Sequence, residues 1–143
     1  MTLYLYDGSE LTLEQLSSKL VEEIIILRQT TLDKFTRNSS GVSRVYQENL
    51  VAANRYKSGS ILPMANGMTP TEYLTGLGAP LGFHADQFAN YILYENNRLG
   101  LIAYDVEKGY LDGKALFMSS QDGNAMITFM NDYKAKCAAV QGA

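Results

Sequence analysis

The spacing of apolar residues after Thr12 constrains the fold of this chain more than any other feature. Side chains that are almost all apolar recur there at steps of three and four, which places them on one face of an α-helix. Thr12 and Gln15 form a capping-box pattern at the start of this segment, and residues 38–41 break the pattern at its end. The residues on the predicted face are Leu13, Leu16, Leu20, Ile24, Leu27, Thr31 and Phe35.

Further segments show the same helical spacing. A second helix is predicted over roughly residues 42–57, with Asn49 in the middle of its apolar face. We expect Asn49 either to pair with a neighbouring helix or to lie solvated beside a gap. Helices are also predicted from about Ala85 to Tyr110 and from about Gly123 to Val140. A hairpin turning at Asp122-Gly123 is the alternative to the last helix.

The segment from Thr69 to Phe88 holds three glycines, two prolines and the only histidine of the chain. Its glycines miss the G-x-G-x-x-G spacing, and no Gly-Lys-Ser/Thr follows, so a phosphate-binding loop is disfavoured. A cap, a proline and a glutamate instead start a short helix at Thr69, which ends near Gly76 and Gly78. We therefore predict a corner between two helices, with a positive φ at Gly78 and with His84 as a cap or surface residue.

Two short segments are candidates for strands. Residues Leu3–Tyr6 read as a strand closed by the turn pair Asp7-Gly8, and Lys114–Met118 is a second candidate after Asp112-Gly113. The two could pair within one chain or between subunits. The fold class we expect is mainly α, an irregular bundle of four to five helices with one or two short strands. We expect residues 1–143 to form a single helical domain.

Composition excludes several classes of protein. Apolar residues make up 46% and charged residues 19% of the chain, as in globular proteins, and the formal charge of −3 favours neither nucleic acid nor anionic lipid. One cysteine and one histidine are too few for an internal disulfide or a Cys/His zinc site. The longest aliphatic run is Ile24–Leu27, and no basic region precedes Asp7. We expect no cofactor, no metal, no membrane partner and a cytoplasmic location, or a virion location if the protein is of phage type.

The candidates for chemistry each have a structural interpretation that we favour. His84 would suit acid–base catalysis, but its nearest acid in sequence faces another side of the helix. Glu95 is either a partly buried acid with a raised pKa or the partner of Arg98 in an ion pair. Cys137 lies on an apolar helix face, where a thiol is unreactive. We expect no catalytic residue, and therefore no enzyme.

A calcium site is also disfavoured. The carboxylates of Asp105, Glu107 and Asp112 are close in sequence, but an EF-hand needs glycine at its sixth position. Here Gly109 is fifth and Tyr110 is sixth. The motif therefore fails.

The predicted helix from Ala85 to Tyr110 is apolar on two sides. One apolar set comprises Phe88, Ile92, Leu99, Ile102, Val106 and Tyr110. A second set, on roughly the opposite side, comprises Leu93, Tyr94, Leu101 and Tyr104. Such a helix is either central in its own domain or buried by a partner chain. Because a domain of this size surrounds few helices completely, we favour self-association through the second set.

Basic residues between Lys34 and Lys57 indicate an alternative function, a small nucleic-acid-binding module. Tyr46 and Tyr56, which would stack on bases, fall on the apolar face of their predicted helix, away from its basic residues. A solvated charged face is the interpretation we favour, and nucleic acid stays the alternative partner. The basic residues concerned are Lys34, Arg37, Arg44, Arg55 and Lys57.

Two segments resemble small accessory proteins of bacteriophage tails, which often have a short N-terminal strand followed by helices rich in Tyr, Asn and Ala. The segments are ENLVAANRYKSG, residues 48–59, and AYDVEKGYLDGKALF, residues 103–117. The likeness is one of composition, so no functional residue is carried over. It implies a virion or assembly role. We therefore expect a non-enzymatic structural or assembly protein that forms homo-oligomers.

Overall fold

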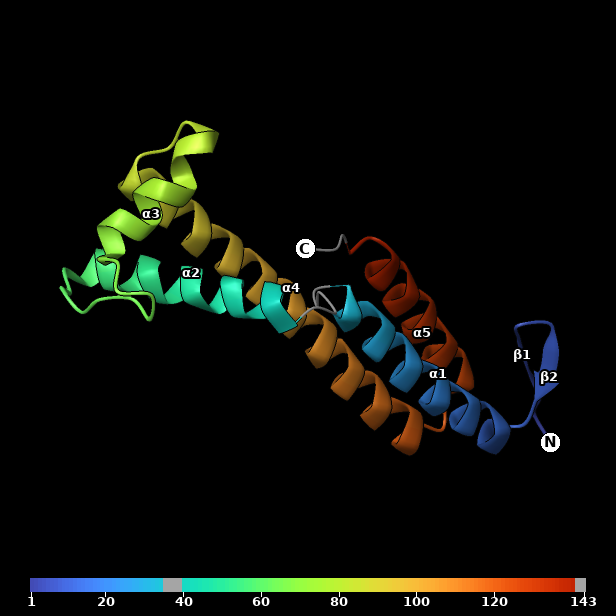
Figure 1. The fold of residues 1–143 in the computed structure, drawn as a ribbon. Coiled ribbons are helices and arrows are strands. Elements are labelled where there is room, and N and C mark those ends of the chain that lie inside the picture. The colour runs from blue at the N-terminus through green and yellow to red at the C-terminus, as the bar shows by residue number, and fades with distance from the viewer. Residues whose placement is uncertain (35–39, 141–143) are drawn as a thin grey trace. The chain divides into compact units, whose positions relative to one another are not determined.

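A computed structural model of the chain describes residues 1–34 and 40–140. This described part is mainly helical, which confirms the expected fold class. It contains five α-helices, a two-stranded sheet and one short 3-10 helix, η1 (Figure 1). The elements in chain order are β1 (Tyr4–Tyr6), β2 (Ser9–Leu11), α1 (Leu13–Asp33), α2 (Ser40–Ser58), α3 (Pro70–Gly78), η1 (Ala79–Leu81), α4 (Ala85–Ser119) and α5 (Gly123–Ala138).

Contacts between residues divide the chain into two compact units. Unit 1 comprises Met1–Thr36 and Ile102–Ala143, and unit 2 comprises Arg37–Leu101. The residues of α4 up to Leu101 belong to unit 2, and its remaining residues belong to unit 1. Each unit has a hydrophobic core of its own. A single helical domain over the whole chain stays a prediction.

The strands β1 and β2 form an antiparallel hairpin in unit 1. Asp7 and Gly8, which join the strands, have φ angles of 52° and 78°. A turn with two positive φ angles matches the twist of the strands that it connects. Tyr6 lies opposite Ser9 in the hairpin. The strand predicted at Leu3–Tyr6 is confirmed, beginning one residue later.

The second predicted strand, Lys114–Met118, is wrong, because these residues lie in the last turns of α4. Asp112 and Gly113 do not form the expected turn. Asp112 instead pairs with Lys108 one helical turn earlier, with 2.7 Å between Oδ2 and Nζ. At Gly113, a Cβ atom would lie only 2.5 Å from Cδ1 of Ile24 on α1. This glycine therefore allows close packing of helices and does not end the helix.

Helix α1 places its predicted face in the core of unit 1. The side chains of Thr12 and Gln15 form the predicted capping box. The residues of the predicted face up to Thr31 are buried or half-buried, and Phe35 lies outside the described residues. In Figure 1, α1 lies beside α5 within unit 1. The buried core of this unit consists of Tyr6, Leu16, Leu20, Ile24, Phe117, Met126, Met130, Tyr133 and Cys137.

The last segment of unit 1 is the predicted helix and not the alternative hairpin. Oδ1 of Asp122 accepts hydrogen bonds from the backbone N–H groups of Asn124 and Ala125, which caps α5. Gly123 follows this cap and faces the hairpin, since a Cβ atom there would lie 2.6 Å from Cε1 of Tyr4. Asp122 and Gly123 thus start a helix where a turn was the alternative.

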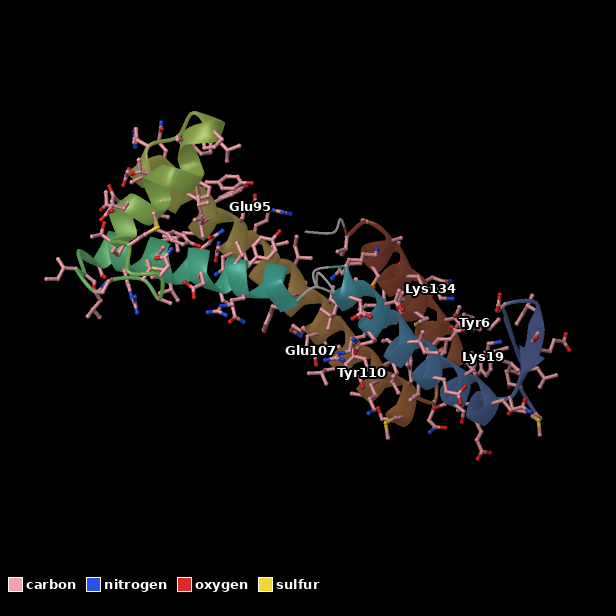
Figure 2. All side chains as sticks on the ribbon, in the orientation of Figure 1. Tyr6, Lys19, Glu95, Glu107, Tyr110 and Lys134 are labelled. Atoms are coloured by element: carbon pink, nitrogen blue, oxygen red, sulfur yellow. The ribbon has the colours of Figure 1, made fainter. Side chains whose placement is uncertain are left out.

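Tyr6, which is buried, fastens the hairpin to α1 and α5. Its hydroxyl donates a hydrogen bond of 2.5 Å to Oε2 of Glu23 and accepts one from Nζ of Lys134. The ammonium groups of Lys19 and Lys134 lie 5.9 and 4.8 Å from the centre of its ring (Figure 2). Burial and the nearby Glu23 carboxylate raise the pKa of Tyr6.

In unit 2, Asn49 joins α2 to α3. The hydroxyl of Tyr73 on α3 donates a hydrogen bond of 2.6 Å to Oδ1 of Asn49. This contact confirms the interpretation of Asn49 as a residue that pairs with a neighbouring helix. The buried core of unit 2 consists of Ala52, Ala53, Met64, Leu74, Ala85, Phe88 and Ala89.

The segment after α3 is the predicted corner, with one correction. The prediction of a positive φ at Gly78 is wrong, because its φ is −80° and α3 continues directly into η1. The left-handed residue is Gly82, which ends η1 with a φ of 76°. Gly78 is required for another reason, since a Cβ atom there would lie 3.0 Å from Cβ of Phe88 and 3.1 Å from the carbonyl oxygen of Phe83.

Candidate self-association surface

Exposed apolar side chains line up along α4 within unit 1. Tyr104, Leu111 and Met118 follow one another at intervals of seven residues and are 63%, 55% and 69% exposed. Lys108 and Ala115 lie between them and are also exposed. The five positions alternate at steps of four and three, which is the spacing of the a and d positions of a heptad repeat. These five residues are called the α4 stripe below.

The α4 stripe lies on the side of the helix opposite to the core of unit 1. Val106 and Phe117 are buried, and Gly113 is buried between them. At about 100° per residue, these three positions fall on the far side of the helix from Leu111. Helix α4 is therefore apolar on two sides within unit 1, and only one of these sides is covered by the chain itself.

Charged residues border the α4 stripe along both of its edges. Helical geometry places Asp105 and Asp112 along one edge and Glu107 and Lys114 along the other. The hydrogen bond from Lys108 to Asp112 raises the pKa of Lys108. The stripe therefore has two acidic side chains along one edge, one acidic and one basic side chain along the other, and a lysine within it.

The second edge is held by contacts within unit 1. Oε2 of Glu107 accepts a hydrogen bond from Nε of Arg28 on α1. The guanidinium of Arg28 lies 5.1 Å from the centre of the Tyr110 ring, and the ammonium of Lys114 lies 5.9 Å from it. Glu107 and Lys114 thus contact side chains of their own chain beside the stripe.

A surface groove of about 350 Å³ runs between α4 and α5 beside the first edge. Gly109 forms part of its lining, and a Cβ atom there would lie 2.7 Å from Cε1 of Tyr133. The lining of the groove carries both signs of charge and two aromatic rings. Its lining residues are Asp105, Lys108, Gly109, Asp112, Phe129, Asp132, Tyr133 and Lys136.

The four residues predicted for self-association fall in both units. In unit 2, Tyr94 and Leu101 are 65% and 59% exposed, whereas Leu93 is half-buried and packs against the core. In unit 1, Tyr104 belongs to the α4 stripe. Sequence reasoning missed Leu111 and Met118, because it ended the helix at Tyr110. The spacing of seven residues from Tyr104 is the signal that would have found them.

Most of the basic residues of the nucleic-acid alternative contact other parts of the chain. In unit 1, Nζ of Lys34 donates hydrogen bonds to the carbonyl oxygens of Cys137 and Val140, at the end of α5. In unit 2, Arg55 donates a hydrogen bond of 2.9 Å to the carbonyl oxygen of Pro63. The charged groups of Lys34 and Arg55 therefore bind backbone carbonyl oxygens of the chain itself.

The other three basic residues complete this set. Nζ of Lys57 lies 2.9 Å from Oδ1 of Asp86, and this pair lowers the pKa of Asp86. Arg44 is exposed at the start of α2, and Arg37 lies outside the described residues. Of the two tyrosines considered for base stacking, Tyr46 is 49% exposed and does not lie on a buried face as expected, whereas Tyr56 is half-buried and packs against the core of unit 2.

The three candidates for chemistry occupy structural positions. His84 caps α4, since its Nδ1 accepts a hydrogen bond from the backbone N–H of Gln87 at 3.4 Å. Glu95 accepts a hydrogen bond of 2.8 Å from Arg98, which is the ion pair that we favoured. Cys137 is buried in the core of unit 1.

Two of the three carboxylates considered for calcium are paired with basic side chains. Glu107 pairs with Arg28, and Asp112 pairs with Lys108. Over the described part of the chain, no group of three or more His, Cys, Asp or Glu side chains could hold a metal ion. In the same ranges, no helix combines the length and the apolar character that crossing a membrane requires.

Comparison of the chain with protein-family models, with curated proteins and with solved structures finds no match.

Proposed function

We propose that this chain is a non-enzymatic structural or assembly protein that self-associates, with a second copy of the chain covering the α4 stripe. The observation that carries the proposal is the row of Tyr104, Leu111 and Met118, each more than half exposed and opposite to the core. Exposed apolar side chains gathered along one helix face form a candidate interaction site. The heptad spacing of the row is the pattern by which one helix packs against another.

The compositional resemblance to accessory proteins of bacteriophage tails supports an assembly role, in a virion or during its construction. The exposed α4 stripe would supply the contact between copies that such a role requires. The nucleic-acid alternative has weaker support, because Lys34, Arg55 and Lys57 are engaged within the chain.

Light scattering at micromolar concentration tests the proposal. We expect the wild-type chain to have a mass above that of one chain, and we expect Tyr104→Glu with Leu111→Glu to reduce it to one chain. Ile26→Glu is the matched control, because Ile26 lies on α1 and is 65% exposed. Circular dichroism should show equal helix content in all three proteins. A wild type that stays monomeric would remove the proposal.

A further inference from the structure

The order of large, small and charged residues in the α4 stripe distinguishes between the ways in which two copies could pair. In an antiparallel pair of heptad-spaced helices, a positions of one helix lie opposite d positions of the other. One such register places Tyr104 opposite Ala115 of the second copy and Lys108 opposite its Leu111. The bulky tyrosine then meets the smallest residue of the stripe, as close packing requires.

The same register brings opposite charges together at four places. Lys108 of each copy lies next to Asp112 of the other, one residue along from Leu111. Lys114 of each copy lies next to Glu107 of the other, across the second edge of the stripe. Asp105 approaches Asp112 of the second copy, and the ammonium groups of Lys108 from both copies lie beside that carboxylate. The four pairs of opposite charge outnumber the two approaches of Asp105 to Asp112, so the register is favourable in its charge contacts on balance.

Other arrangements replace one or both kinds of these attractive pairs with pairs of like charge. A parallel pair in register places Lys108 against Lys108 and Glu107 beside Asp112 of the second copy. Sliding the antiparallel pair by one heptad places Glu107 against Glu107 in one direction and Lys114 against Lys114 in the other. Like charges facing each other across an interface oppose the wrong pairing and set the register.

Resting on the self-association proposed above, we propose that two copies pair their α4 stripes antiparallel about a two-fold axis, with Lys108 of each copy beside Leu111 and Asp112 of the other. The partner surface is thus the same surface on a second copy, which closes the assembly at two chains through this contact.

Disulfide formation tests the orientation. In the antiparallel pair, residue 104 of one copy lies opposite residue 115 of the other, whereas two copies of residue 115 are about 16 Å apart along the axis. A disulfide requires Cα atoms within about 7 Å. We expect Tyr104→Cys with Ala115→Cys to form a covalent dimer on mild oxidation, and Ala115→Cys alone to form none. The wild type is the control, because its Cys137 is buried.

Three other results of the disulfide experiment would each contradict the proposed pairing. A covalent dimer of Ala115→Cys alone would show a parallel pair and overturn the inference. No covalent dimer of the double variant, from a wild type that light scattering shows to be oligomeric, would show that another surface forms the contact. A monomeric wild type would remove the proposed function and the inference with it.

Charge reversal tests the register by a second route. We expect Lys108→Glu and Asp112→Lys each to weaken the dimer at least tenfold in dissociation constant, because each variant places like charges across the axis. An equimolar mixture of the two should associate again, since the carboxylate introduced at position 108 of one chain then faces the ammonium introduced at position 112 of the other. High salt should weaken both effects. A mixture that stays dissociated, beside a dimeric wild type, would overturn the proposed register.

Discussion

The hydroxyl of Tyr73 on α3 lies 2.6 Å from Oδ1 of Asn49 on α2, and this hydrogen bond joins two helices of unit 2. We expect Tyr73→Phe to lower the free energy of unfolding of this unit by about 1 kcal/mol, because it removes the donor from a half-buried amide. Asn49→Ala should cost a similar amount. In a double-mutant cycle by urea unfolding, the two changes should couple by about 1 kcal/mol. Strictly additive effects would show that the contact contributes nothing in solution.

Gly113 should resist substitution despite its position inside a helix. Alanine has the higher helix propensity, by about 1 kcal/mol. Its Cβ atom, however, would lie 2.5 Å from Cδ1 of Ile24 and 2.6 Å from Cε1 of Phe129. We expect Gly113→Ala to destabilise unit 1 by about 1–2 kcal/mol in urea unfolding, through overpacking.

Two variants control this prediction. Gly100→Ala should stabilise the helix, because a Cβ atom there meets nothing within 4 Å. Ile24→Val removes the atom nearest to the new methyl group, so Gly113→Ala with Ile24→Val should be less destabilised than the sum of the single changes. A neutral Gly113→Ala would contradict the close packing of α4 against α1.

The pKa of Tyr6 predicts a loss of stability at high pH. Its pKa in the folded chain is raised above the ordinary value of 10.0 by burial and by Glu23. The folded state therefore favours the protonated phenol. The resulting stabilisation is fully present below pH 10 and is lost as the pH rises through the folded-state pKa. The pKa of Lys134 is raised as well, so its contribution to the stability of the fold is also lost as the pH rises.

Urea unfolding at several pH values from neutral to strongly alkaline measures this loss. Tyr6→Phe should flatten the decline, because it removes the titrating hydroxyl. The decline should not vanish, since the pKa of the buried Tyr133 is also raised, mainly by burial. An unchanged pH profile in Tyr6→Phe would show that Tyr6 is not coupled to folding.

Substitution of either glycine at the corner of unit 2, Gly78 or Gly82, should destabilise the unit, but for a different physical reason at each site. Gly82 has a φ of 76°, so Gly82→Ala should cost about 1 kcal/mol through backbone strain, and Gly82→Asn should cost less because asparagine tolerates this region. At Gly78 the backbone is ordinary and space is short. At Gly78 the larger asparagine should therefore destabilise unit 2 more than alanine does, whereas at Gly82 alanine should destabilise it more than asparagine. Thermal unfolding of the four variants gives the comparison, and the same order at both sites would refute it.

His84 should be replaceable by another capping residue. Its Nδ1 accepts the N–H of Gln87, and asparagine offers an acceptor at the same place. We expect His84→Asn to leave the stability within a few tenths of a kcal/mol and His84→Ala to lower it by about 1 kcal/mol. Equal stability of the two variants would argue against the cap.

Local signals in the sequence were sufficient for the ends of several helices. The capping boxes at Thr12 and Thr69 satisfy backbone N–H groups within three residues, so their geometry depends little on the rest of the chain. The buried face of α1 follows from the spacing of its apolar residues, because the direction of a side chain depends on its position along the helix. The turn at Asp7-Gly8 could also be predicted locally, because aspartate and glycine tolerate the positive φ angles that it requires.

Other features depended on contacts between distant segments, and tertiary structure decided them. The pair at Asp112-Gly113 reads as a turn by itself, but packing of Gly113 against Ile24 continues α4 to Ser119. Glycine is likewise required at position 78 because Phe83 and Phe88 leave no room for a side chain, and not because of its backbone φ.

The candidate surface shows the same division. The sequence by itself determined that one helix carries apolar residues on two sides, because side-chain direction follows from position along a helix. Only the tertiary structure decided which of these sides is exposed, since burial depends on the other helices. It buried Val106 and Phe117 and left Leu111 and Met118 uncovered. Exposure of an apolar side chain is a property of the packed chain, and no local preference encodes it.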